Sequence, residues 1–120
     1  MNLVIVGIGG IFGGLCRFQF GKVISQKSNS TFPVGTFIIN ISGAFLLGIL
    51  TSVDPTKRTY LFLGDGFLGT YTTFSTFMYE GFNLFQGNEK LNAFTYILGS
   101  LIIGIVGYVS GYALGKLLNF

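Results

Sequence analysis

The residues most able to do chemistry lie in one segment, residues 66–77, which reads GFLGTYTTFSTF. Glycines and hydroxyl side chains interrupt an otherwise apolar stretch here, and the segment holds no carboxylate, histidine or thiol. In a bilayer an unpaired backbone group is costly, so an interrupted helix persists only where protein buries it or where it lines an ion or water site. The available ligands are backbone carbonyls, hydroxyls and the ring edges of Phe74 and Phe77. This set indicates a site for ions.

The composition indicates a membrane protein. Of the 120 residues, 50% are hydrophobic and only 9% are charged, too few charges to solvate a globular surface. Four apolar stretches, each near the ~20 residues that a spanning helix needs, cover about residues 3–24, 34–53, 60–85 and 93–118. We therefore predict one all-α transmembrane domain of four helices with a broken third helix. We expect the helices to contact membrane lipid, and we expect no nucleic acid partner.

The lysines and arginines bear on orientation. Four spans put both termini on one side, and the two sides then carry three and four positive charges. These are Lys57, Arg58 and Lys116 on the side of the termini, and Arg17, Lys22, Lys27 and Lys90 on the other. Because an excess on one side normally fixes orientation, this balance favours insertion both ways and an antiparallel homodimer. The alternative is one dominant orientation, because individual loops weigh unequally.

Polar residues inside the spans follow a helical spacing. Asn40 lies near the middle of the second span and shares a face with Thr36, and Tyr96, Ser100 and Gly104 recur every four residues in the fourth. An amide at this depth is expensive unless it has a partner, which favours a function for Asn40, although polar residues also join helices. The glycines repeated at four-residue spacing in the first and fourth spans favour close helix packing.

Arg17 and Glu80 are charged residues within the apolar blocks. An ionisable residue inside a membrane is a functional hypothesis by default. Both, however, lie within reach of a membrane face, where a long side chain can extend to water. We predict a vestibule or structural role for them rather than a place in a conduction path.

Three motifs together resemble the Fluc (CrcB) family of fluoride channels. They are residues 66–77 followed by Glu80, residues 35–40 (GTFIIN) in the second span, and residues 9–17 (GGIFGGLCR) in the first. The resemblance covers essentially the whole chain. It implies a dual-topology antiparallel homodimer in a bacterial plasma membrane that exports fluoride passively and relieves fluoride toxicity. It also implies two fluoride pathways and one structural sodium ion at the dimer centre.

The resemblance further implies roles for individual residues. The backbone carbonyls of Gly69 and Thr72 would bind the sodium ion. The fluoride pathway would consist of Asn40, Phe74, Ser75, Phe77, Tyr96 and Ser100. Fluoride is small and strongly hydrated, so its water must be replaced by hydrogen-bond donors and positive ring edges, and uncharged groups let the ion leave again.

Simpler interpretations stay open for the same residues. Phe74 and Phe77 lie three apart on one helix face, which is also typical of ordinary packing. The interruption is also compatible with a simple kink whose freed backbone groups bond the hydroxyls of Thr70, Thr72 and Thr73.

Other classes of protein fit less well. A proton-coupled small multidrug transporter is also a small dual-topology dimer, but it needs a carboxylate in its first span, and residues 3–24 contain none. A small accessory membrane subunit would suit the composition, and fluoride flux by the purified chain would exclude it. An enzyme is not expected, because the sequence has no histidine, no metal-ligand cluster and no nucleophile with a base.

Overall fold

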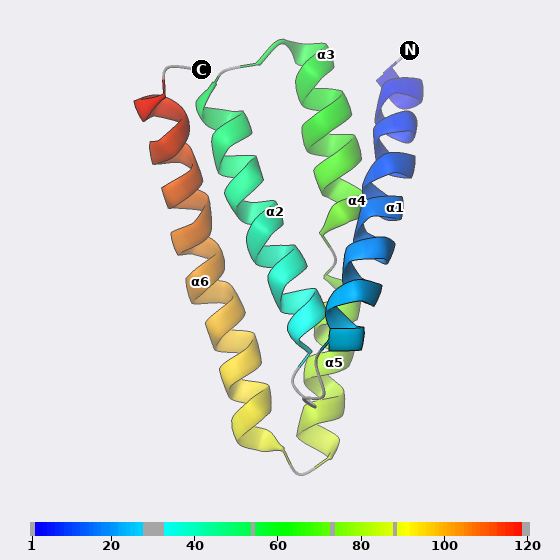
Figure 1. The fold of residues 1–120 in the computed structure, drawn as a ribbon, viewed down its shortest axis with the longest axis vertical. Helices are drawn as coiled ribbons and strands as arrows, with labels where there is room; N and C mark the ends of the chain where they lie inside the picture. The colour runs from blue at the N-terminus through cyan, green and yellow to red at the C-terminus, as the bar shows by residue number, and fades with distance from the viewer. Residues whose placement is uncertain (1, 28–32, 54, 73, 88, 119–120) are drawn as a thin grey trace.

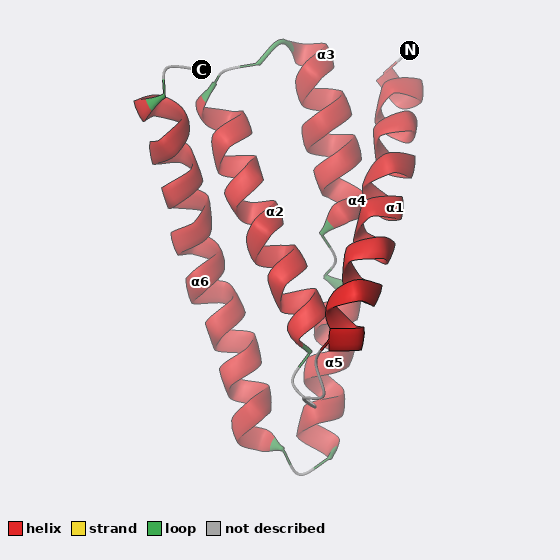
Figure 2. Ribbon diagram, viewed as in Figure 1, coloured by secondary structure: helices red, strands yellow, loops and turns green. Residues whose placement is uncertain are grey.

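The computed structural model describes residues 2–27, 33–53, 55–72, 74–87 and 89–118. Regular structure within these ranges is helical, as Figure 2 shows. Three helices contain segments long and apolar enough to cross a membrane. They are α1 (Asn2–Lys27), α2 (Val34–Ser52) and α6 (Lys90–Leu117). The prediction of an all-α membrane protein is confirmed at this level.

A further helical segment, which we call helix 57–71, runs without a gap through three short elements. They are α3 (Lys57–Thr59), η1 (Tyr60–Leu68) and α4 (Gly69–Tyr71). After residues 72–74 the chain continues as α5 (Ser75–Gln86). Neither helix 57–71 nor α5 alone reaches the ~20 residues that a membrane crossing needs.

The middle of helix 57–71 is wound in wide π turns. In η1 each amide reaches back five residues instead of four, and the Gly69 amide accordingly donates to the Gly64 carbonyl. The glycines of this stretch allow close contact, because Gly64 lies against Leu50 of α2 and Gly66 lies against the backbone of α1. Such turns are rare and are frequent near functional sites.

The helices form an elongated bundle (Figure 1). The most extensive contacts join α2 to α6 and α1 to η1, while α5 packs against α6 beyond the interruption. The beginning of α1 and the end of α6 lie at the same end of the bundle as α3. In the same view, the interruption between helix 57–71 and α5 lies near the middle of the bundle's long axis.

Glycines bring the helices into backbone contact. A Cβ atom at Gly13 would overlap the Phe67 carbonyl oxygen, and one at Gly111 would overlap the Phe45 carbonyl oxygen. The first contact joins α1 to η1 and the second joins α6 to α2. The interpretation of these glycines as packing positions agrees with this geometry.

Gly13→Ala should lower the stability of the protein by about 1–3 kcal/mol, because the added methyl group overpacks the contact between α1 and η1. Gly7→Ala is the matched control in the same helix, since a Cβ there meets nothing within 4 Å. Thermal unfolding in detergent measures the difference. Equal unfolding midpoints for the two variants would contradict the packing role.

Candidate functional site

Helix 57–71 stops inside the bundle. Thr72 has an extended backbone (φ −83°, ψ 159°), and helical structure resumes at Ser75. The Leu68 carbonyl accepts hydrogen bonds from the amide of Thr72 at 3.1 Å and from its hydroxyl at 2.9 Å. Among the described residues, no backbone amide outside the regular helical bonds donates to a carbonyl of residues 69–71. The interruption therefore presents backbone oxygen atoms as possible ligands.

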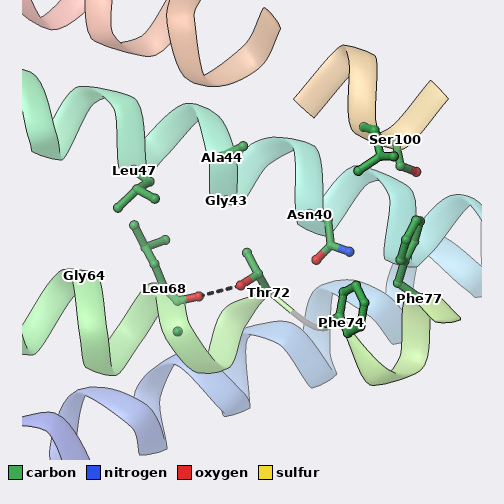
Figure 3. Close-up of a pocket in the computed structure, with 12 residues that line it drawn as sticks. Asn40, Gly43, Ala44, Leu47, Gly64, Leu68, Thr72, Phe74, Phe77 and Ser100 are labelled. Atoms are coloured by element: carbon green, nitrogen blue, oxygen red, sulfur yellow. Dashed lines mark hydrogen bonds between the residues drawn. The ribbon is translucent and has the colours of Figure 1, made fainter. Parts of the chain in front are cut away.

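A pocket of about 420 Å³ lies beside the interruption (Figure 3). Its walls come from α2, helix 57–71, the start of α5 and the middle of α6. The lining residues are Asn40, Gly43, Ala44, Leu47, Gly64, Leu68, Gly69, Thr72, Phe74, Phe77, Ser100 and Leu101. None of these described lining residues is charged, so any ion held here is held by dipoles.

Hydrogen-bonding groups enter the pocket from two helices. The Asn40 amide projects from α2 towards the stretch that holds Thr72 and Phe74, as Figure 3 shows. Ser100 enters from α6, and its buried hydroxyl forms no hydrogen bond with any described residue. A buried hydroxyl without a partner costs about 1–3 kcal/mol. The pocket is thus suited to a ligand that accepts hydrogen bonds.

Two phenylalanine rings border the same pocket. The ring centroids of Phe74 and Phe77 are 6.2 Å apart, and their planes are tilted by 44°. Phe77 is only 6% exposed and packs at 5.0 Å and 50° against the ring of Tyr96, whereas Phe74 is 75% exposed. Because these rings are tilted and not stacked, their edges, which carry the positive part of the aromatic quadrupole, can be turned towards an anion.

Hydroxyl groups fasten the end of helix 57–71 to its neighbours. The Thr70 hydroxyl donates to the Gly10 carbonyl of α1 at 2.8 Å. The hydroxyls of Tyr71 and Ser42 lie 2.9 Å apart and join α4 to α2. Sequence reasoning did not find these two links, although a threonine opposite a glycine-rich helix was a readable signal for the first. They hold the interruption in place from both sides.

The threonine hydroxyls do not account for every freed carbonyl. The single proton of the Thr70 hydroxyl is shared between the Gly10 carbonyl and, at 3.2 and 3.3 Å, the carbonyls of residues 66 and 67, while the Thr72 hydroxyl donates to the carbonyl of residue 68. The carbonyl of Gly69 is not among their acceptors, and Thr73 lies outside the described residues. A kink satisfied by hydroxyls therefore explains only part of the geometry in the described part of the chain.

The pocket brings together six of the residues singled out from the sequence. They are Asn40, Gly69, Thr72, Phe74, Phe77 and Ser100. Tyr96 does not line the pocket, since its fully buried ring lies behind Phe77 with Thr36 and Glu80 nearby. The side chain of Ser75 lies outside the described residues. The roles assigned to all of these residues stay predictions.

Arg17 and Glu80 lie outside the pocket lining. Both are partly buried, and neither the Arg17 Nε atom nor the Glu80 Oε1 atom has a hydrogen-bond partner among the described residues. Their position is compatible with a vestibule or a structural role, which stays a prediction.

One charged residue of helix 57–71 was missed by sequence reasoning. Asp65 lies in η1, one turn before Gly69, and its side chain is exposed in the single chain. The signal was readable, because an aspartate stands inside the apolar block 60–85. It does not line the pocket.

Comparison with known proteins gives concordant results. Residues 4–112, which include every residue lining the pocket, match the family described as CrcB-like protein, Camphor Resistance (CrcB). A protein of Clostridium acetobutylicum, named fluoride-specific ion channel FluC 2, is 56% identical over 98% of this chain and 100% of its own length. Proteins named fluoride-specific ion channel FluC from Hydrogenobaculum and Ruminiclostridium cellulolyticum are 42% and 40% identical. They cover 98% and 97% of this chain and 100% and 93% of their own lengths.

Proposed function

The chain belongs to the CrcB-like protein family, and from this premise we propose that it is a fluoride-selective ion channel. Fluoride leaves the cell through it passively, down its electrochemical gradient, which relieves fluoride toxicity. Such transport is not catalysis, so the protein is not an enzyme. We assign it to the plasma membrane of a bacterium as a multi-pass protein, since the relatives compared above are bacterial and three helices are apolar enough to cross.

The observation that carries this proposal is the uncharged pocket beside the interruption. Fluoride must exchange its water for other donors, and Asn40 of α2 and Ser100 of α6 supply N–H and O–H groups to the pocket. Phe74 and Phe77 add ring edges, which bind an anion weakly. Because no lysine or arginine lines the pocket, the ion is not trapped, and conduction requires release as much as binding. Tyr96 and Ser75 extend this path in the proposal.

The complete channel is an antiparallel homodimer. Residues 57–86 form a third, interrupted crossing in each copy, which makes four crossings per chain. Phe74, 75% exposed in the single chain, is covered when a second copy packs against it. With the two-fold axis in the membrane plane, the interruptions of the two copies meet at the dimer centre and two pathways result.

A structural sodium ion at the dimer centre is part of the proposal. The donor set fits such an ion, because backbone carbonyls are hard oxygen ligands and the end of helix 57–71 presents them without amide partners from a continuing helix. Gly69 and Thr72 are the residues whose carbonyls would hold it. Bound there, the ion supplies fixed positive potential between the two pathways.

Liposomes that contain only this protein should release fluoride at least about a hundredfold faster than chloride, because chloride is too large to pass between the rings. The rates are measured with ion-selective electrodes while a potassium ionophore balances the charge. Protein-free liposomes are the control for leakage. Comparable chloride and fluoride rates would defeat the proposal, and no flux by the pure chain would favour an accessory subunit.

A further inference from the structure

Asp65 is the only acidic residue in helix 57–71. It follows Lys57, the first residue of the helix, by eight positions, which places it roughly 10 Å below the helix start. An aspartate side chain is too short to bring its carboxylate from this depth to the water at the membrane face, whereas lysine and arginine side chains are longer. A carboxylate at this depth is costly and calls for an interaction that offsets the cost.

The single chain offers no such interaction among the described residues. Asp65 is exposed and forms no hydrogen bond or ion pair with any of them. α1, the helix most extensively packed against η1, carries cations only after Gly13, which lies at the level of Phe67. α2 carries no lysine or arginine, and the nearest cations along helix 57–71 are at its start. Its compensating positive charge therefore has to come from outside the single chain.

The exposed strip of helix 57–71 leads from Asp65 to the interruption. Gly69 follows Asp65 by one helical turn, and both residues are exposed, as is Thr70. Of the buried residues of the same helix, Gly66 lies against α1, whereas Gly64 and Leu68 line the pocket beside α2. Asp65 and the carbonyl end of the helix thus lie on the side that a second copy would cover.

We propose that Asp65 raises the affinity of the cation site formed by the backbone carbonyls of Gly69 and Thr72. This inference rests on the proposed function, which supplies the cation and the dimer. Carbonyls are neutral ligands, and a carboxylate one turn away adds the negative charge that they lack. In an antiparallel dimer the two copies of Asp65 lie on opposite sides of the central ion, so both act on it.

The same position keeps Asp65 out of the anion route. It is not among the residues that line the pocket, so its carboxylate makes no contact with fluoride there and acts on the cation through space, from one turn before Gly69. Asp65 is therefore a positioning residue for the sodium ion. Its effect is electrostatic, and sodium binding is the quantity to measure.

Asp65→Asn should raise the sodium concentration for half-saturation by at least about tenfold, since a unit charge one helical turn from the ligands acts strongly where little water screens it. Equilibrium binding of radioactive sodium to the purified dimer measures this, with choline chloride holding ionic strength constant. Glu89→Gln removes the same charge at the start of α6, outside the membrane spans, and is the matched control. An unchanged sodium affinity in Asp65→Asn, or no sodium binding by the wild type, would overturn the inference.

If the dimer with Asp65→Asn in both copies does not fold, a mixed dimer with the substitution in one copy still tests the inference. One wild-type and one Asp65→Asn chain, isolated through two different tags, should show about the square root of the full effect, because each charge contributes equally. Wild-type affinity in the mixed dimer would count against the inference. Fluoride efflux by the wild type is measured on the same preparation, so a failed channel proposal is recognised separately from a failed role for Asp65.

Discussion

Fluoride efflux should fall by at least about a hundredfold when Phe74 or Phe77 is replaced by isoleucine, because the ring edge that coordinates the anion is lost. Isoleucine keeps the apolar character and much of the bulk, so the pocket loses its positive edges without becoming polar. Efflux from liposomes with equal amounts of protein, read with a fluoride electrode, gives the ratio. Size-exclusion chromatography of each variant reports the yield of folded dimer.

The two positions differ in what else they support. Phe77 is 6% exposed and belongs to a buried cluster with Leu84, Ala93 and Tyr96, so its replacement also weakens packing. Phe74 is 75% exposed in the single chain, so Phe74→Ile leaves the packing within each chain intact, and the dimer yield reports any loss of contact with the second copy.

Phe82→Ile is the matched control for both substitutions. This phenylalanine is exposed on α5 and does not line the pocket, and the variant should therefore conduct like the wild type. Normal efflux from well-folded Phe74→Ile and Phe77→Ile would mean that the two rings only pack and do not coordinate fluoride.

The long helices were predictable because lipid leaves the backbone few choices. Apolar length alone predicted spanning helices where α1, α2 and α6 occur, since a helix satisfies its own backbone within a bilayer. The helix ends were less predictable. α6 begins at Lys90 and not near residue 93, because its first turn is polar and held by local bonds, such as that from Asn92 to Glu89 at 3.3 Å.

The wide turns of η1 had no signal in the sequence. Periodicity distinguishes helix types only when one face is polar, and Tyr60–Leu68 is apolar on most sides. The π winding accompanies tertiary packing, in which Gly64 meets Leu50 and Gly66 meets the backbone of α1. Packing of this kind depends on which helices become neighbours, and spacing along one helix does not reveal that.

The site was predictable in its parts and not in its assembly. Glycines and hydroxyls around Gly69 and Thr72 stand out in an apolar chain because lipid penalises them. That Asn40 of α2 and Ser100 of α6 line the same pocket depends on the close approach of these two helices. The approach is set by Gly48 against the Tyr108 backbone, together with further contacts of the same kind.

A reporter fused to the C-terminus should be found on both sides of the membrane in comparable amounts. Lysine and arginine occur towards both ends of the bundle. Lys57, Arg58 and Lys116 lie at the end shared by α3 and the end of α6, and the second half of α1 and the start of α6 carry Arg17, Lys22, Lys27 and Lys90 towards the opposite end. Because neither end has a clear excess of positive charge, neither orientation is favoured during insertion. Paired reporters, one active only inside the cell and one only outside, measure the ratio. A reporter found on one side only, in a preparation that still conducts fluoride, would overturn the antiparallel homodimer.

Adding three lysines to the link at residues 54–58 should bias the chain into one orientation and abolish efflux, because every antiparallel pair then lacks one member. Activity should return when a second chain, with three lysines added at residues 87–92, is co-expressed and supplies the opposite orientation. Three glutamines at 54–58 are the control for length, and they should leave both orientations and the efflux intact. If only the co-expressed pair conducts, and neither variant does so by itself, the channel requires two copies in opposite orientations. Full activity of the lysine variant by itself would instead mean that parallel copies conduct, and the shared cation site of Gly69 and Thr72 would lose its geometric basis.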